Sequence, residues 1–143
     1  MKKYLALAAL GLLASCTSAQ LERRPSREAA YEGEKKLNEL ILKEDSSEEG
    51  YEGNAQSFRI LTKLALRSAN APGLDLTRAV LAASIKYPWS YSDAIAKDKA
   101  KGGDGSRLKY GYFRTEETDF NFAMRDHPKG VKSIEAQIMD YAD

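Results

Sequence analysis

Apolar side chains recur along this chain at spacings of three, four and seven residues, whereas no useful stretch alternates apolar and polar residues as a β-strand does. The helical pattern holds in about five stretches, which begin at or close to Ser26, Asn54, Thr77, Thr115 and Pro128. The segment 90–105 is rich in lysine, aspartate and glycine and shows little periodicity, and its end at 102–105 predicts a mobile loop. We expect an all-α body whose core contains Phe58, Ile60, Leu61, Leu64, Val80, Leu81, Ile85, Ile134 and Ile138.

The composition predicts one small globular domain. Among 143 residues, 22 basic and 21 acidic side chains leave a formal net charge of +1, and 43% of the residues are hydrophobic. This balance gives no electrostatic argument for nucleic-acid binding, so no specific nucleic-acid partner is expected. The only cysteine, Cys16, excludes an intramolecular disulfide and a cysteine-based zinc site. No glycine-rich phosphate loop is present either.

The N-terminal residues have the order of a secretory signal, with two lysines, an apolar stretch and then small residues. The run Leu13-Ala14-Ser15-Cys16 also resembles the bacterial lipobox, in which the cysteine is acylated. An ordinary secretory peptide cut after Ala19 is the alternative. The lipobox interpretation predicts a signal at 1–15, lipidation at Cys16, a linker at 16–26 and a helical domain at 27–143, with an address at the outer membrane.

Several strings in the body resemble the dGTP triphosphohydrolase-like branch of the HD-domain phosphohydrolases. They are Gly33-Glu34, EGNAQSFRIL at 52–61, KYPW at 86–89, KYGYF at 109–113 and EAQIMDYAD at 135–143. The resemblance extends from Arg27 to Asp143. It implies a partial helical bundle of the HD-domain type, related to enzymes that hydrolyse a deoxynucleoside triphosphate to a deoxynucleoside and triphosphate. Such enzymes use a divalent metal, such as Mg²⁺ or Mn²⁺, held by two histidines and two aspartates.

The same resemblance shows where this chain departs from the family. Glu22-Arg23 stands where the family has its His-Asp pair, and the chain reaches only the first member of the Asp-Asp pair, Asp143. The only histidine, His127, lies in a turn before the last helix and does not match a ligand position. We therefore expect no metal, no cofactor and no hydrolysis of deoxynucleoside triphosphates by this chain.

Glu34 and the group Asn54, Gln56 and Arg59 match motif positions near the family's reaction centre. Glu34 matches a glutamate that supports an acid–base histidine, but Tyr31 occupies the histidine position, which favours a solvated helix glutamate. Candidate nucleotide contacts are Asn54, Gln56 and Arg59 at a helix N-terminus, together with Lys86 and Tyr87. The competing interpretation makes Asn54 an N-cap, puts Gln56 and Arg59 on an outer face, and assigns the KYPW and KYGYF aromatics to packing.

The N-terminal signal and the helical body predict different cellular locations and roles. A genuine signal makes the chain a non-catalytic, lipid-anchored envelope protein with a structural or interaction role, in contact with the membrane through Cys16. A wrong signal prediction leaves a cytoplasmic relative of the triphosphohydrolases that binds a deoxynucleoside triphosphate weakly. In both cases a partial helical bundle exposes apolar surface, and we expect marginal stability or self-association.

Overall fold

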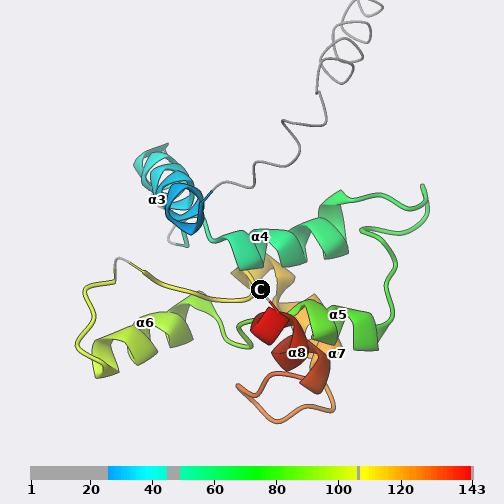
Figure 1. Cartoon of the computed structure of the whole chain (residues 1–143). Coiled ribbons are helices and arrows are strands. Elements are labelled where there is room, and N and C mark those ends of the chain that lie inside the picture. The colour runs from blue at the N-terminus through cyan, green and yellow to red at the C-terminus, as the bar shows by residue number, and fades with distance from the viewer. Residues whose placement is uncertain (1–25, 45–48, 106, 143) are drawn as a thin grey trace, which may run out of the picture. The chain divides into compact units, whose positions relative to one another are not determined.

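The computed structural model describes residues 26–44, 49–105 and 107–142, and Figure 1 shows them as helices joined by loops. The chain divides into two units, Met1–Gly33 and Glu34–Asp143. Six α-helices lie in the described ranges, which contain no β-strand. The predicted all-α class is confirmed. The signal, Cys16, Glu22-Arg23 and Asp143 lie outside the described residues, so the limits expected for signal, linker and domain remain predictions.

The first described helix, α3 (Arg27–Glu44), begins where the sequence predicts it. The backbone N–H of Ala29 donates to Ser26 Oγ at 3.1 Å, which is the contact of an N-cap. Helix α4 (Gly53–Arg59) continues directly into a π-helical turn, η1 (Ile60–Leu64). The chain then passes beneath η1 at Gly73, whose φ of +66° and close approach to the Leu61 carbonyl leave no room for a side chain.

The helices that follow differ in extent from the prediction. Helix α5 (Arg78–Ser84) ends three residues before Tyr87. Helix α6 (Tyr91–Ala100) lies in the segment for which no helix is predicted, which is a correction, while the predicted loop at 102–105 follows its end. Thr115 is not an N-cap, because it lies inside a 3₁₀ turn, η2 (Arg114–Glu116), and its hydroxyl donates to Glu116. The turn leads into α7 (Glu117–Ala123), and α8 (Ile134–Ala142) follows after Pro128 as predicted.

Two clusters of buried side chains hold the helices of the second unit together. The first joins α4, α5, α7 and the chain before η2, and contains Phe58, Leu81, Ala82, Ile85, Tyr112, Ala123 and Met124. The second joins α4 to α6 and to the chain before η2, and contains Ala55, Ala94, Tyr110 and Phe113. Helix α4 belongs to both clusters because Ala55 and Phe58 lie three residues apart on one face. Its N-terminus is therefore fixed from two sides.

Some of the residues predicted to lie in the core are buried, and others are exposed. Phe58, Leu81 and Ile85 are buried, and Leu61 is partly buried against them. The predicted core residues that the structure exposes are Ile60, Leu64, Val80, Ile134 and Ile138, with 42% to 72% of their surface accessible. Each lies two residues from a buried position, namely Phe58, Thr62, Ala82 or Ala136. Residues two positions apart in a helix point in directions that differ by about 200°. A residue two positions from a buried one therefore points outward.

Candidate functional site

Three charged side chains from separate parts of the second unit meet at the N-terminus of α4. Lys109 Nζ lies 2.5 Å from Glu34 Oε2 and 3.0 Å from Glu52 Oε1. Glu52 is 1% exposed, whereas Lys109 and Glu34 retain 34% and 22% exposure of their side chains. A buried carboxylate needs a partner because desolvation disfavours its charge. Lys109 supplies that partner, so Glu34 is not the solvated helix glutamate of the competing interpretation.

Glu52 also caps α4. Its carboxylate accepts the backbone N–H of Asn54 at 2.7 Å and that of Ala55 at 2.9 Å, and it accepts the Asn54 side-chain amide at 2.7 Å. The prediction that Asn54 is the N-cap is therefore wrong, because Glu52 holds that place and Asn54 lies in the first turn. The Gly53 N–H donates to Glu34 Oε1 at 2.6 Å, so Glu34 helps to fix the same turn.

The pKa of Lys109 follows from this arrangement. Burial disfavours the ammonium and lowers the pKa, but the hydrogen bonds and charges of Glu34 and Glu52 outweigh burial and raise it above its ordinary value. The phenol of Tyr110, which donates to the Glu49 carbonyl, has its pKa raised well above the ordinary value, first by burial and then by the charge of Glu52. Both groups therefore keep their protons at neutral pH.

A cavity of about 340 Å³ opens beside this cluster, between the first turn of α4 and the end of α8. Its lining residues are Asn54, Lys86, Met139 and Ala142. Asn54 and Lys86 are two of the candidate nucleotide contacts, and the fold brings them together from positions 32 residues apart (86 − 54).

Lys86 forms an ion pair beside this cavity. Its Nζ lies 3.0 Å from Asp140 Oδ1, and Lys132 pairs with the other oxygen of the same carboxylate. The hydrogen bonds from Lys132 and from Lys86 lower the pKa of Asp140, which therefore stays ionised. Lys86 and Lys132 therefore share one carboxylate at the edge of this cavity.

The remaining candidates do not gather around the cavity. Arg59 turns to the other side of α4, where Nε lies 3.2 Å from both oxygens of Glu116 and the guanidinium lies 4.0 Å above the ring of Phe113. Gln56 is partly buried in α4. Tyr87 packs against Trp89, with ring centroids 5.5 Å apart. Arg59 keeps 31% of its side-chain surface exposed and forms an ion pair with Glu116 within the protein.

Sequence reasoning missed Glu52 and Asp140 and gave Lys109 only a place in an aromatic and basic cluster. Glutamate is not among the preferred N-cap residues, so Glu52 carries no cap signal in the sequence. Asp140 pairs with Lys86, which is 54 residues away in the chain (140 − 86). Lys109 pairs with Glu34, which is 75 residues away (109 − 34). The local pattern contains no sign of either pairing.

The described residues do not fit the divalent metal that the resemblance implies. Within 26–44, 49–105 and 107–142, no group of three or more histidine, cysteine, aspartate or glutamate side chains could hold a metal ion. Glu34 and Glu52 share Lys109, and an ammonium between two carboxylates competes with a cation for them. His127 lies in the turn before α8, among residues that line a different cavity.

The comparisons with known proteins identify the relatives of this chain. No family model matches it. It is 34% identical over 133 residues to a deoxyguanosinetriphosphate triphosphohydrolase-like protein of Streptomyces coelicolor, covering 91% of this chain and 28% of the relative. Proteins of the same description in Corynebacterium efficiens and Bifidobacterium longum are 37% and 38% identical over 118 and 98 residues, covering 79% and 66% of this chain and 25% and 20% of the relatives.

This chain is homologous to part of the deoxyguanosinetriphosphate triphosphohydrolase-like proteins. It spans about a quarter of the length of the curated relatives that it matches. The expected resemblance is thus confirmed at the level of the family, and the matched region includes most of the chain.

Proposed function

We propose that this triphosphohydrolase relative binds the triphosphate of a deoxynucleoside triphosphate at the Asn54–Lys86 cavity and does not hydrolyse it. The observation that carries the proposal is the cavity itself, which joins two candidate contacts from α4 and from the segment after α5. The substrate class comes from the names of the relatives. The volume of about 340 Å³ lies at the lower end of the range for ligand sites.

Two polar side chains at the wall of the cavity can contact a phosphate chain. Lys86 supplies an ammonium, which shares the carboxylate of Asp140 with Lys132. Asn54 adds an amide whose orientation is set by Glu52. A charge-assisted hydrogen bond from an ammonium to a phosphate oxygen is about twice as strong as a neutral one.

The proposal of no hydrolysis rests on the residue types. A metal-bound water supplies the nucleophile in metal-assisted phosphoryl chemistry, and its ligands are nitrogen and oxygen side chains in a defined set. This chain contains one histidine, His127, at the larger cavity, and Tyr31 stands where the resemblance expects an acid–base histidine. A phenol is a much weaker acid than an imidazolium, so a tyrosine does not replace a histidine in acid–base catalysis at neutral pH.

Calorimetric titration with dGTP tests binding. We expect saturable binding that weakens about tenfold in Lys86→Met, because a charge-assisted contact is lost. Lys101→Met is the matched control, since Lys101 is exposed in the loop after α6 and should leave affinity unchanged. The absence of saturable dGTP binding, or equal affinity in the wild type and Lys86→Met, would contradict the proposal.

We also propose that the chain reaches the bacterial envelope through Cys16, on the evidence of the Leu13-Ala14-Ser15-Cys16 run. Among the described residues no helix is long and apolar enough to cross a membrane. Incorporation of labelled palmitate by an expressing bacterium tests the lipid anchor. We expect label on the wild type and none on Cys16→Ala. Unlabelled wild-type protein in the cytosolic fraction would overturn the anchor and leave the nucleotide proposal in place.

A further inference from the structure

The end of α8 contributes a carboxylate at the edge of the Asn54–Lys86 cavity. Met139 and Ala142 line the cavity, and Asp140 lies between them in the sequence. Asp140 Oδ1 is 3.0 Å from Nζ of Lys86, the residue to which we assign a contact with the phosphate chain. A negative charge of the protein therefore lies at the same ammonium that the proposed ligand uses.

The contacts of Asp140 are of the kind that a phosphate group makes. Its two oxygens accept from two ammonium groups, those of Lys86 and Lys132. Two non-bridging oxygens of a phosphate group likewise present two anionic acceptors on one central atom, and both anions form charge-assisted hydrogen bonds with ammonium groups. The carboxylate and a ligand phosphate therefore compete for Lys86.

The ion pair between Lys86 and Asp140 can open without leaving the carboxylate uncompensated. The side chains of Lys86, Lys132 and Asp140 keep 19%, 23% and 33% of their surface exposed, so water reaches all three. Ion pairs in contact with water contribute little to stability. Lys132 lies outside the described lining of the cavity and remains a partner for Asp140 when a ligand takes Lys86. Exchange of the carboxylate for a phosphate at Lys86 therefore costs little.

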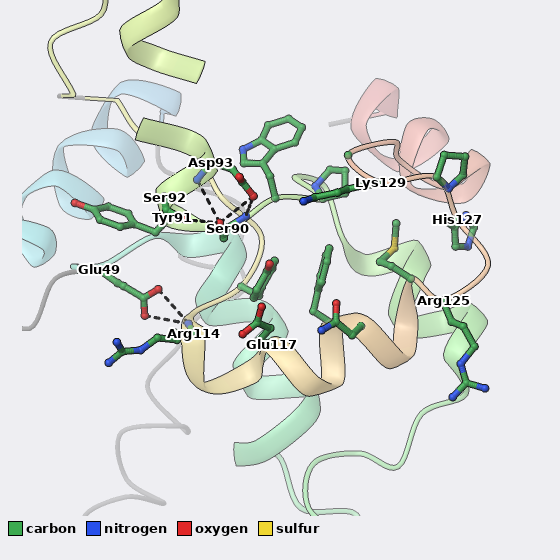
Figure 2. A pocket seen from close by; sticks show the side chains of 18 residues that line it. Glu49, Ser90, Tyr91, Ser92, Asp93, Arg114, Glu117, Arg125, His127 and Lys129 are labelled. Carbon is green, nitrogen blue, oxygen red and sulfur yellow. Dashed lines mark hydrogen bonds between the residues drawn. The ribbon is translucent and has the colours of Figure 1, made fainter. Parts of the chain in front are cut away.

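A second cavity, of about 710 Å³, provides a comparison within the same protein. It is bounded by the start of α6, by α7 and by the turn that joins α7 to α8 (Figure 2), and the two cavities share no described lining residue. Its charged lining residues are three acids and three bases, namely Glu49, Asp93, Glu117, Arg114, Arg125 and Lys129. This balance does not favour a phosphate chain, so a lysine of this wall is a suitable control.

We propose that Asp140 is an internal competitor of the phosphate and that its carboxylate sets the affinity of the Asn54–Lys86 cavity for a phosphate chain. Lys132 is a positioning residue, because it draws the same carboxylate away from Lys86. This role of Asp140 rests on the proposed triphosphate site. It makes Asp140 the residue that determines how strongly the site distinguishes a triphosphate from a ligand without phosphate.

Calorimetric titration of Asp140→Asn with three ligands tests this role. The ligands are dGTP, inorganic tripolyphosphate and deoxyguanosine. We expect Asp140→Asn to bind dGTP and tripolyphosphate about tenfold more tightly than the wild type does, because the competing charge is removed. The affinity for deoxyguanosine should not change. Unchanged or weaker binding of either phosphate ligand, or an equal gain for deoxyguanosine, would overturn the role of Asp140.

Glu135→Gln and Lys129→Gln are the matched controls. Glu135 is an exposed acid in the first turn of α8, so its substitution removes one negative charge from the same helix outside the described lining of the cavity. Lys129→Gln removes a lysine from the wall of the larger cavity. Each should change dGTP affinity by less than about twofold. A gain in Glu135→Gln equal to that in Asp140→Asn would reveal a general effect of charge and overturn the proposal.

A cycle of substitutions at Lys132 and Asp140 separates competition from damage to the fold. Lys132→Met leaves the carboxylate to Lys86 and should weaken dGTP binding about threefold. The double variant Lys132→Met and Asp140→Asn should bind dGTP within about twofold of Asp140→Asn, because Lys132 acts through that carboxylate. A double variant as weak as Lys132→Met would overturn the proposal, since Lys132 would then contact the ligand itself.

Failure of this role and failure of the triphosphate site give different results. If the wild type binds dGTP, Lys86→Met binds it more weakly and Asp140→Asn binds it as the wild type does, the role of Asp140 is overturned and the proposed function stands. Binding by Asp140→Asn alone would support the competition and overturn the proposed function of the wild type. If no variant binds dGTP or tripolyphosphate, both proposals are overturned.

Discussion

Glu52 is a carboxylate with 1% of its surface exposed, and four donors satisfy it. Two are backbone N–H groups of α4, one is the amide of Asn54, and the fourth is the ammonium of Lys109. Removing one partner of a buried charge costs more than the pair contributes, because the remaining charge has no compensation. Lys109 is the one charged donor among the four, so the first turn of α4 depends in part on this lysine.

Lys109→Met should destabilise the protein by about 2 kcal/mol, which is less than for a fully buried pair because water reaches Lys109. The pKa of Lys109 is raised in the folded state, so its contribution is complete below its ordinary value of 10.5 and is lost as the pH rises through the raised value. The free energy of unfolding, measured in urea at pH 8 and at pH 11, tests this pH dependence. The wild type should lose more stability than Lys109→Met across that interval, and an equal loss would refute the assignment.

Arg59 should contribute to stability, because its side chain contacts other residues of the protein. Its guanidinium contacts Glu116, which is 3% exposed, donates to Thr115 Oγ1 at 2.9 Å and lies over Phe113. Arg59→Lys should still lower the free energy of unfolding by about 1–2 kcal/mol, since an ammonium cannot make the forked contact. Chemical denaturation measures this, and dGTP affinity should stay as in the wild type. A loss of dGTP affinity without a loss of stability would restore Arg59 as a substrate contact.

At the scale of elements, the sequence predicts the helical class and the positions of most helices, because apolar spacing and caps such as Ser26 are local signals. It does not predict which face of a helix is buried. The buried residue of α8 is Ala136, and Ser133 is buried just before the helix, where its hydroxyl donates to the Ala82 carbonyl of α5, while Ile134 and Ile138 point outward. Close approach of two helices favours small side chains, and this preference overrides the hydrophobic pattern.

The sequence does not predict helix α6, because its hydrophobic residues are too few to show a helical period and its lysines and aspartates indicate a solvated segment. The helix is stabilised at its start by a capping box, in which the Asp93 N–H donates to Ser90 Oγ at 3.2 Å and the Ser90 N–H donates to the Asp93 carboxylate. Ala94 is its one buried residue, and Tyr91 packs against the same cluster, with its ring centroid 5.4 Å from that of Tyr110. The cap and these contacts together stabilise α6.

Ser90→Ala should lower the free energy of unfolding by about 1 kcal/mol, because it removes the side-chain acceptor of the cap. Ser92→Ala is the matched control: Ser92 is exposed in the first turn and contacts only the Ser90 hydroxyl among the described groups. Thermal unfolding monitored by circular dichroism distinguishes the two. Equal effects of both substitutions would show that the capping box does not stabilise α6.

At the scale of the whole molecule, the exposed apolar side chains are the dominant feature. On α8, Ile134, Ile138 and Tyr141 are 72%, 65% and 94% exposed and follow one another at helical spacing. On η1 and just beyond, Leu64 and Leu66 are 58% and 72% exposed. Exposed surface of this kind promotes association in water.

We therefore expect concentration-dependent self-association in sedimentation velocity experiments. The double substitution Ile134→Glu and Ile138→Glu should shift the protein toward the monomer, because both side chains are exposed and a charge there is compatible with the fold. Helical content should stay as in the wild type. A wild type that sediments as a monomer at all accessible concentrations would contradict this prediction.

The central claim is that the chain binds a deoxynucleoside triphosphate at the Asn54–Lys86 cavity without turning it over. The most direct measurement incubates the purified protein with dGTP and Mn²⁺ and follows bound nucleotide and released triphosphate in the same sample. The account predicts saturable binding, weakened in Lys86→Met, with no triphosphate above the background of protein-free controls. Release of triphosphate that a chelator abolishes and that Glu34→Ala removes would contradict it, because it would place a working metal centre beside Glu34.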